Sequence, residues 1–451
     1  MNSSTVKFAH LADLHLGSWR DPSMRKLSTE VFVKAIDDAI EKNVDFILFA
    51  GDIFNTSLPG VDTLKIVTKK LKELYDLGVP LYVISGSHDF SPSGKTMVDV
   101  LENAGLLKNV CKGQVNDETK LLELKFTIDE KTKTKIVGIV GRRGLLDKTY
   151  YENLERKKLE DENGIKIFMF HTTLTELKPK HLEMIDSQPA SFLPKNFNYY
   201  AGGHIHHKTL INIEGYGPMT YPGALFPTNF SELEKYSFGG YYFVTIEDDR
   251  IKGDESPYLI DENLQSKDSE KQHIETRETE RETENSKKQQ IEWVPIKIKG
   301  HRSIIINCNN KNPSKIEEEL LLFAKEDIKD KLITIRLFGT LESGKISDIN
   351  FQEINKEYYD KGAFMIMKNT TKLVSKEYQE IKITTNKEVM EEEIIKEHLG
   401  QMSTFDIETE KELISSLLHT LNSKKNDGEK VFDFTDRINQ DIKLILEKTD
   451  K

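Results

Sequence analysis

Short apolar runs rich in β-branched and aromatic residues recur through the first 250 residues, separated by stretches whose apolar positions repeat with the period of a helix. This alternation predicts a layered α/β domain in which helices cover sheets. The strands are expected at 6–11, 46–50, 81–85, 136–140, 165–170 and 241–246. We place this first domain at residues 1–260.

A helix is expected between the second and third of these strands, at 59–77. The stretch opens with a turn at Pro59 and closes at Gly78. Its apolar positions stand at helical spacing and are Leu64, Val67, Leu71 and Leu74. The pattern favours a helix that packs on the sheet, and a helix that pairs two copies of the chain is the alternative.

The sequence changes character after residue 260. Residues 261–290 are almost wholly polar, with only Leu264 and Ile274 apolar, so they predict a disordered insertion or a solvated helix that forms no core. A small α+β domain is expected at 291–385. Its expected strands are 293–298, 303–307 and 332–337, and its expected helix is 313–324.

The last segment, 386–451, has the pattern of two amphipathic helices joined by a turn at 426–428. The first helix has an apolar face formed by Leu413, Ile414, Leu417, Leu418 and Leu421, and the second one formed by Ile438, Ile442 and Ile445. Two short helices cannot bury both faces alone. They either dock on the chain's own core or bind a partner.

Composition allows a sizeable core and limits the classes of function. Hydrophobic residues make up 37% of the 451 residues, and no run approaches the roughly 18 apolar residues of a membrane helix. The start shows no targeting pattern, so we expect an intracellular protein, cytoplasmic or associated with the nucleoid. A net charge of -11 argues against coating nucleic acid by charge alone, although a local basic cleft is compatible with it. Cys111 and Cys308 stand far apart, which supports neither a disulfide nor a thiolate metal cluster.

Metal-ligating residues follow the apolar runs at the points where these runs end. Five segments occur in order: Asp13-Leu14-His15, Gly51-Asp52, Gly86-Ser87-His88-Asp89, His171 and Gly202-Gly203-His204-Ile205-His206. Open α/β sheets place their sites beyond the carboxyl ends of strands. Carboxylate, imidazole and hydroxyl donors suit Mn²⁺, our first choice, and also Fe²⁺ or Zn²⁺. Each motif alone is weak evidence, but their order predicts a two-metal phosphoesterase site.

The five segments resemble the calcineurin-like metallophosphoesterases from residue 6 to about residue 246. Fuller strings at 8–17, 50–54, 202–206 and 221–224 are similar to the DNA double-strand-break repair nucleases of archaea and eukaryotes, called SbcD in bacteria. The run 337–344 resembles the DNA-binding cap of that family. The two C-terminal helices resemble its docking segment for a coiled-coil ABC-type ATPase, called SbcC in bacteria.

This resemblance implies a metallophosphoesterase β-sandwich flanked by helices, a cap domain and a helical tail. It also implies a Mn²⁺-dependent nuclease, with 3′ to 5′ exonuclease and single-strand endonuclease activity, that acts on DNA ends. A homodimer bound to the ATPase is implied as well, with the helices at 59–77 and 96–107 forming the dimer interface and no role for a membrane.

Ligand roles carry over from the resemblance by motif. One metal would be held by Asp13, His15, Asp52 and His206, and the second by Asp52, Ser87, His171 and His204, with Asp52 bridging. His88 would protonate the leaving oxygen or stabilise developing charge, with Asp89 holding the other nitrogen of its ring. A structural histidine is the alternative for His88. We assign structural roles to His10 and His181, and a structural role or a DNA contact to His207.

Ser87 departs from the resembled pattern, which has asparagine at this position. An amide carbonyl is a better neutral metal ligand than a hydroxyl, so we expect the second metal to bind weakly or a water to fill the gap. Two rival functions stay open. One is a phosphatase or cyclic-nucleotide phosphodiesterase on the same core, and the other, motivated by Ser87, is a non-catalytic scaffold that bridges DNA ends and regulates the ATPase.

Basic residues beside the ligand loops are candidates for phosphate contacts. Arg20, Arg25 and Lys26 follow the first ligand loop, and Arg142 and Arg143 follow a strand end. Solvated surface charge is the alternative for each of them. Base-specific recognition is not expected, because a nuclease that processes ends needs backbone contacts.

Overall fold

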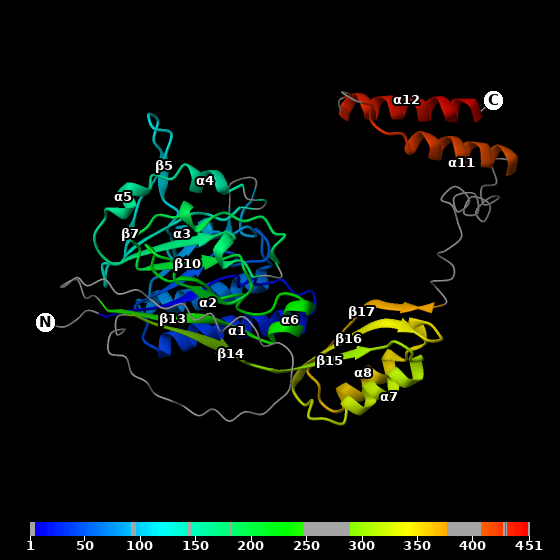
Figure 1. Ribbon diagram of the computed structural model, residues 1–451, viewed down its shortest axis with the longest axis horizontal. Helices are drawn as coiled ribbons and strands as arrows, with labels where there is room; N and C mark the ends of the chain where they lie inside the picture. The colour runs from blue at the N-terminus through cyan, green and yellow to red at the C-terminus, as the bar shows by residue number, and fades with distance from the viewer. Residues whose placement is uncertain are drawn as a thin grey trace. The chain divides into compact units, whose positions relative to one another are not determined.

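The computed structural model describes residues 5–91, 96–142, 144, 146–179, 182–247, 289–376, 407–426, 429 and 431–449. The chain divides into two compact units, one of Met1–Ile305, Phe323–Arg336 and Asn355–Asn369 and one of Ile306–Leu322, Leu337–Ile354 and Thr370–Lys451. Both large sheets lie in the first unit (Figure 1). None of the helices in the described ranges is long and apolar enough to cross a membrane.

Two six-stranded sheets pack face to face in the first unit. In the first, the order is β14 (Gln289–Ile296), β13 (Gly239–Glu247), β1 (Thr5–Leu11), β2 (Phe46–Ala50), β3 (Leu81–Ile84) and β4 (Lys108–Asn109). In the second, it is β11 (Thr209–Ile211), β12 (Met219–Tyr221), β10 (Tyr199–Gly203), β9 (Lys166–His171), β8 (Lys135–Gly138) and β7 (Thr127–Ile128). Their facing sides share one apolar core that includes Phe8, Leu48, Ile167 and Tyr199.

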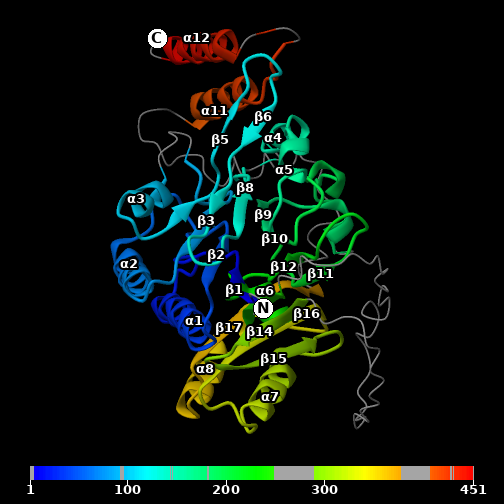
Figure 2. The same ribbon diagram turned by 90° about the vertical axis from the view of Figure 1, so that its left-hand side faces the viewer.

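Helices cover the outer face of the first sheet, as the alternating pattern predicts. These are α1 (Pro22–Glu41), α2 (Val61–Asp76) and α3 (Met97–Asn103), which lie side by side in Figure 2. Asp21 caps α1 by accepting hydrogen bonds from the backbone N–H groups of Ser23 and Met24, and Pro22 stands where its missing N–H costs nothing. The outer side of the second sheet has a separate core, with α4 (Lys148–Glu152) and α5 (Arg156–Glu160) beside it.

Parallel pairing brings the ends of the central strands together. In the first sheet, β1, β2 and β3 run parallel, and in the second, β8, β9 and β10 do so. All five residues of β2 and all six of β9 are buried, which explains their continuous apolar runs. The six expected strands of this domain are all present. The layered α/β sandwich is therefore confirmed.

The boundary expected before the cap domain is wrong. Gln289 and Gln290, assigned from sequence to the polar linker, begin β14, which pairs antiparallel with β13 from Gly239↔Ile296 to Ile246↔Gln289. The run at 293–298 is thus mainly the edge strand of the first sheet. It pairs with the outer side of β13, whose backbone groups would otherwise be unpaired there. The remainder of the segment expected to be a disordered insertion lies outside the described residues.

The other expected elements have the predicted type. A three-stranded sheet is formed by β15 (Gly300–Asn307), β16 (Lys331–Leu341) and β17 (Met365–Ser375), and the helices of this region are α7 (Pro313–Phe323) and α8 (Phe351–Asp360). The tail forms α11 (Ile407–Leu421) and α12 (Val431–Thr449), which pack against each other. Smaller elements are α6 (Phe230–Tyr236) and the hairpin of β5 (Gly113–Val115) and β6 (Leu122–Leu124).

Candidate metal centre

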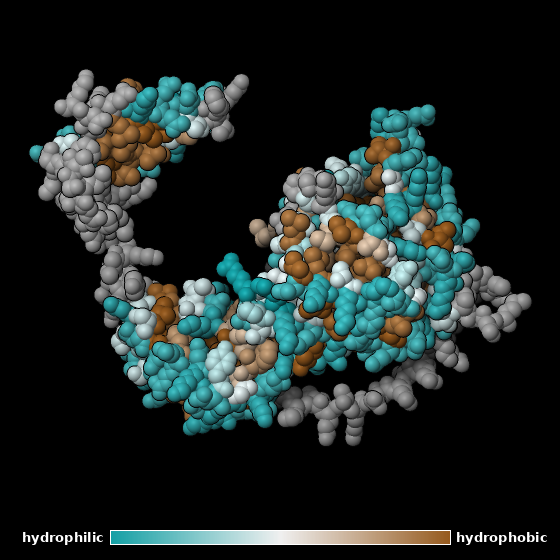
Figure 3. All heavy atoms as spheres, turned by 180° about the vertical axis from the view of Figure 1, so that it is seen from behind, coloured by the Kyte–Doolittle hydropathy of each residue, from teal (hydrophilic) through white to brown (hydrophobic). Residues whose placement is uncertain are grey.

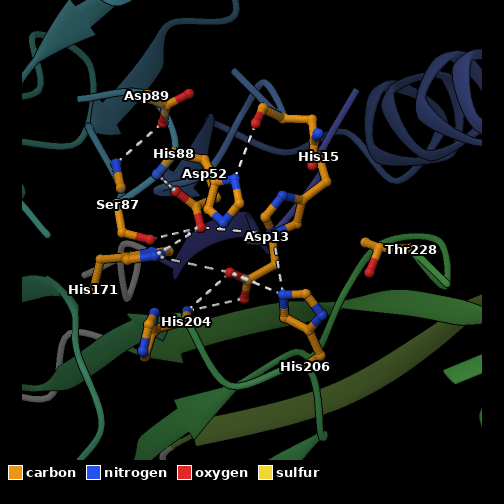
Figure 4. Close-up of polar contacts among 12 residues, drawn as sticks. Asp13, His15, Asp52, Ser87, His88, Asp89, His171, His204, His206 and Thr228 are labelled. Carbon is orange, nitrogen blue, oxygen red and sulfur yellow. Dashed lines mark hydrogen bonds and ion pairs between the residues drawn. The ribbon is translucent and has the colours of Figure 1, made fainter. Parts of the chain in front are cut away.

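The residues proposed as metal ligands converge where strands of both sheets end. Asp13 and His15 follow β1, Asp52 follows β2, and Ser87 follows β3, while His171 ends β9 and His204 and His206 follow β10. Figure 4 shows their polar atoms pointing toward one another. Residues as far apart in sequence as Asp13 and His206 therefore form a single cluster.

The backbone at this cluster adopts conformations that side chains rarely tolerate. The φ angles of Asp13, His15, Asp52 and His204 are 50°, 42°, 51° and 92°. Hydrogen bonds between loops hold these turns, from Asp13 N to Gly51 O at 3.1 Å and from His15 N to Asp52 O at 2.9 Å. The tertiary structure thus maintains local strain at the ligand positions.

Three groups of side chains, which share members, can each hold a metal ion. Within each group the ligand atoms lie within 4.8 Å of one another. The groups are Asp13, His15 and His206; His15, Asp52 and His88; and Asp52, His171 and His204. His15 Nε2 lies 3.0 Å from His206 Nε2, and His171 Nε2 lies 3.2 Å from Asp52 Oδ2. Asp52 and His15 each belong to two of the groups, and of these two side chains only the carboxylate of Asp52 has two oxygens with which to bridge.

Several imidazole rings are oriented by a partner on their far nitrogen. His171 Nδ1 donates to Ala50 O at 2.8 Å, and His206 Nδ1 donates to Glu232 Oε1 at 2.9 Å. Each Nε2 then faces the cluster, as in protein metal sites generally. His171 Nε2 is buried and faces Asp52 Oδ2 at 3.2 Å without good hydrogen-bond geometry, so a cation between the two groups would satisfy both. The donor set therefore fits two divalent metal ions.

Burial and neighbouring charges control the protonation of these ligands. Burial is the main cause that lowers the pKa of His15 to about 3 and that of His204 to about 4, so both rings are neutral and free to ligate. Although burial opposes the effect, His171 holds the pKa of Asp52 well below its usual range. Asp52 in turn raises the pKa of His171 to about 10 despite its burial. A cation at this position competes with that proton, so metal affinity should weaken as pH falls.

Ser87 lies at the cluster, and its hydroxyl forms a hydrogen bond with the ligand Asp52. Its Oγ donates to Asp52 Oδ2 at 3.4 Å, and only 6% of the residue is exposed. The neighbouring backbone N–H of His88 donates to Asp52 Oδ1 at 2.7 Å. Two groups of the loop after β3 therefore donate to Asp52, and metal binding by Ser87 stays a prediction.

The role expected of Asp89 as the partner of His88 is wrong. Asp89 is buried and accepts hydrogen bonds from the backbone N–H groups of Ile53, Phe54 and Gly86 at 3.0 to 3.1 Å. The ring of His88 is held instead by Asn55 O, 2.9 Å from its Nδ1. Asp89 fixes two ligand loops to each other, and burial raises its pKa to about 6.

The four arginines proposed to contact DNA have different surroundings. Arg20 is exposed, and the guanidinium of Arg25 donates to the carbonyls of Trp19 and Arg20. Arg142 lies 4.6 Å from the ring centroid of Phe90 and donates to the hydroxyl of Tyr150 at 3.0 Å. Arg143 lies outside the described residues, as does His181. DNA binding by these arginines stays a prediction.

Sequence reasoning missed the groups that orient the histidines. Glu232 accepts from His206, from the backbone N–H of Thr228 and from Asn229 Nδ2. The spacing of Asn229 and Glu232 is that of a helix start, and this is the signal that marks the position, because the glutamate of a capping pair turns back toward the cap. The backbone carbonyls of Ala50 and Asn55 carry no sequence signal.

Comparisons with known proteins agree with this geometry. Residues 6–208 match the family model described as calcineurin-like phosphoesterase. A DNA double-strand break repair protein Mre11 of Methanococcus maripaludis is 27% identical over 374 residues, which are 77% of this chain and 93% of that protein. The protein of the same name from Archaeoglobus fulgidus is 26% identical over 242 residues, which are 51% of this chain and 52% of that protein.

Among solved structures, a dimetal phosphatase from Danio rerio aligns with a TM-score of 0.34 at 10% identity, over 54% of this chain and 92% of that one. The family match over residues 6–208 and the clustered donors together support a metal-dependent phosphoesterase site in the first part of the chain.

Proposed function

We propose that this protein, which carries a calcineurin-like metallophosphoesterase domain, is a two-metal DNA nuclease that processes the ends of double-strand breaks. The observation that carries the proposal is the convergence of seven donor residues from both sheets, with the far nitrogens of His171 and His206 held by partners. DNA is the proposed substrate because the relatives described above are named as double-strand break repair proteins.

Two Mn²⁺ ions are the proposed cofactors. Asp13, His15, Asp52 and His206 would hold one, and Asp52, Ser87, His171 and His204 the other. When bound, the cations would supply Lewis-acid activation of the phosphodiester and of a water. His88 stands beside them with Nδ1 bound to Asn55 O, which leaves Nε2 to protonate the leaving sugar oxygen.

The larger assembly is also a proposal. The region from β15 to β17 would act as a DNA-binding cap, and α11 and α12 would bind a coiled-coil ABC-type ATPase. The chain would work as a homodimer through α2 and α3. Exonuclease activity in the 3′ to 5′ direction and endonuclease activity on single strands are proposed on the same basis.

Cleavage of end-labelled duplex and hairpin DNA tests the proposal, with Mn²⁺ or Mg²⁺ and with the ATPase partner present or absent. Asp52→Ala should abolish cleavage because it removes the bridging carboxylate. His88→Gln should lower kcat by about 10²- to 10⁴-fold and leave Mn²⁺ affinity unchanged by calorimetry. His419→Gln, at an exposed position of α11, is the control and should cleave like the wild type.

The same experiment separates the rival functions. Absence of cleavage by the wild type under every condition would favour a scaffold that bridges DNA ends, which the contact between Ser87 and Asp52 motivates. Turnover of small phosphoesters without DNA cleavage would favour a phosphatase or cyclic-nucleotide phosphodiesterase.

A further inference from the structure

Two exposed lysines near the metal centre lie over aromatic rings. The ammonium of Lys208 is 4.3 Å from the ring centroid of Trp293, and that of Lys297 is 4.2 Å from the ring centroid of Phe238. The two rings are themselves 6.3 Å apart, and both are half-buried. These four residues form one continuous surface, which we name the lysine-aromatic stripe.

The edge of the first sheet builds this stripe. Trp293 is on β14 opposite Tyr242, and Phe238 immediately precedes β13. The indole lies against Gly240, where an added Cβ would be 2.8 Å from ring atom Cζ2, and its Nε1 donates to Pro222 O at 3.0 Å. The indole of Trp293 is therefore held by the contact with Gly240 and by the hydrogen bond to Pro222 O. The exposed Lys208 side chain lies over the ring.

The stripe is continuous with the metal centre. Because β13 runs antiparallel to β1, the start of β13 lies at the end of β1 that carries Asp13. Leu225 N donates to Asp13 O at 3.3 Å, and Gly239 approaches the carbonyl of Leu225 so closely that a Cβ would lie 2.3 Å from it. Lys208 is two residues beyond the ligand His206. A polymer that crosses the stripe would thus reach the cluster of ligands.

The two lysines give the stripe a positive charge that can pair with phosphates. Within the described ranges, neither Lys208 nor Lys297 forms an ion pair with a carboxylate, and the ring beneath each ammonium is its contact. At an exposed site the attraction between a cation and a ring is weak, so a phosphate can replace the ring as the partner of each lysine. The stripe therefore offers two cations and two ring faces to one ligand.

We propose that the lysine-aromatic stripe binds single-stranded DNA and guides it to the metal centre. Unpaired bases expose faces that stack on Trp293 and Phe238, while Lys208 and Lys297 turn to the adjacent phosphates. A duplex hides its base faces and can use only the lysines. This inference rests on the proposed nuclease function and adds the residues that hold a single strand and the path of that strand to the metal centre.

Fluorescence provides a direct test, because the chain has only two tryptophans, Trp19 and Trp293. In a Trp19→Phe protein without metal, oligothymidine should quench the emission of Trp293, and a duplex of equal length should quench it far less. Replacing Lys208 and Lys297 together by alanine should weaken binding of the oligothymidine about tenfold. It should also reduce the slope of log K against log salt by about 1.4, at roughly 0.7 per lysine.

A matched control removes two other exposed lysines, by Lys157→Ala with Lys195→Ala. Lys195 also lies over an aromatic ring, 5.9 Å from the centroid of Tyr216, but it precedes β10, whose opposite end carries the ligands. The control should bind oligothymidine like the wild type. At the stripe, Trp293→Phe should retain affinity and Trp293→Leu should lose it, with folding of both verified by circular dichroism.

Equal losses in both lysine pairs, no quenching by oligothymidine, or equal quenching by duplex would each overturn the proposal. Hydrolysis of bis(p-nitrophenyl) phosphate by the wild type with Mn²⁺ measures the metal centre by itself, because this small ester has no strand to lie on the stripe. If the wild type hydrolyses neither this ester nor DNA, the proposed nuclease fails while the binding result stands. The two failures are therefore distinguishable.

Discussion

At the scale of single residues, Ser87 is the proposed ligand that should weaken binding of the second metal. Its hydroxyl donates to Asp52 Oδ2, and the resembled pattern has an amide at this position. Ser87→Asn should raise Mn²⁺ affinity, by about tenfold at the weaker site, because an amide oxygen is a better neutral donor. Titration calorimetry of the metal-free protein measures this, and nuclease rates at limiting Mn²⁺ should rise in parallel.

The control for this prediction is Ser87→Ala, which removes the hydroxyl without adding a donor. Its affinity should equal or fall below that of the wild type. Tighter binding in the alanine variant, or no change in the asparagine variant, would show that Ser87 is not at a ligand position.

His10 supports a prediction on acid stability. It is fully buried between the sheets, with Nδ1 3.0 Å from the hydroxyl of Tyr199, as its expected structural role requires. Burial lowers its pKa from 6.5 to about 3. Below pH 6.5 the unfolded chain therefore binds a proton that the folded chain rejects until about pH 3. The free energy of unfolding should fall across this window by up to about 1.4 kcal/mol per pH unit.

Urea unfolding between pH 7 and pH 5 checks this sign and its origin. His10→Gln should be less stable than the wild type at pH 7 but should lose less stability on acidification. His419→Gln, an exposed substitution, should keep the full dependence on pH. An unchanged pH dependence in His10→Gln would assign the acid sensitivity to other groups.

At the scale of elements, the two sheets approach each other closely at the metal centre, and glycines permit it. A Cβ at Gly203 would lie 2.0 Å from Ala50 O and 2.7 Å from His171 Nδ1. Gly203→Ala should therefore separate β10 from β2 and displace His171. We expect a loss of 2 kcal/mol or so in stability, within the range for overpacking, and metal affinity at least tenfold lower.

Gly60→Ala is the matched control, because a Cβ at Gly60 meets nothing within 4 Å. Thermal unfolding and calorimetry should give near wild-type values for this variant. Equal behaviour of the two alanine variants would contradict the role of close sheet packing.

The proposed dimer interface requires different positions from those that the sequence pattern indicates. Leu71 is only 1% exposed and belongs to the core of the first unit, so a charge there would unfold the chain instead of dissociating a dimer. The exposed apolar residues of α2 include Val61 at 80% and Tyr75 at 60%. Val61→Glu with Tyr75→Glu should convert a dimer to a folded monomer in light scattering.

Leu322→Glu is the control, since Leu322 is 59% exposed and belongs to the other compact unit of the chain. This variant should keep the wild-type mass. A wild type that is monomeric, or a dimer that survives the double substitution in α2, would remove α2 from the interface.

At the scale of the whole molecule, the tail helices leave apolar surface uncovered. Leu418 and Leu421 of α11 are 38% and 61% exposed, and Leu444 and Leu446 of α12 are 58% and 47% exposed. Figure 3 shows this apolar surface on the helix pair. Leu421→Glu with Leu444→Glu should abolish co-purification with a coiled-coil ABC-type ATPase, because an amphipathic helix pair binds by its apolar face.

The same double variant should retain the basal nuclease activity of the chain alone, since the ligands lie in the first unit. Lys411→Glu, an exposed polar position of α11, is the control for charge and should still bind the ATPase. Unchanged co-purification of the leucine variant would place the ATPase contact elsewhere.

The sequence predicted which strand each ligand segment follows, and it predicted which elements are helices and which are strands. Both depend on the local pattern of residues. Strand ends such as Asp13 and Asp52 are visible as an apolar run followed by a polar residue, and α7 is visible as a helical period. The pattern could not assign β14 to a sheet. The same local sequence could form an edge strand of the first sheet or a strand of the α+β domain. The pairing of β14 with β13 is a nonlocal choice.

The sequence by itself determined which chemistry is possible here: carboxylates and imidazoles at the ends of parallel strands, with Ser87 as the one unusual donor. Only the tertiary structure decided which nitrogen His171, His88 and His206 present, because Ala50 O, Asn55 O and Glu232 select it from distant parts of the chain. The tertiary structure also decided that Asp89 accepts hydrogen bonds from the backbone of the ligand loops and that Leu71 is buried. Hydrogen-bond partners and burial depend on contacts between segments, which a local pattern of residues does not contain.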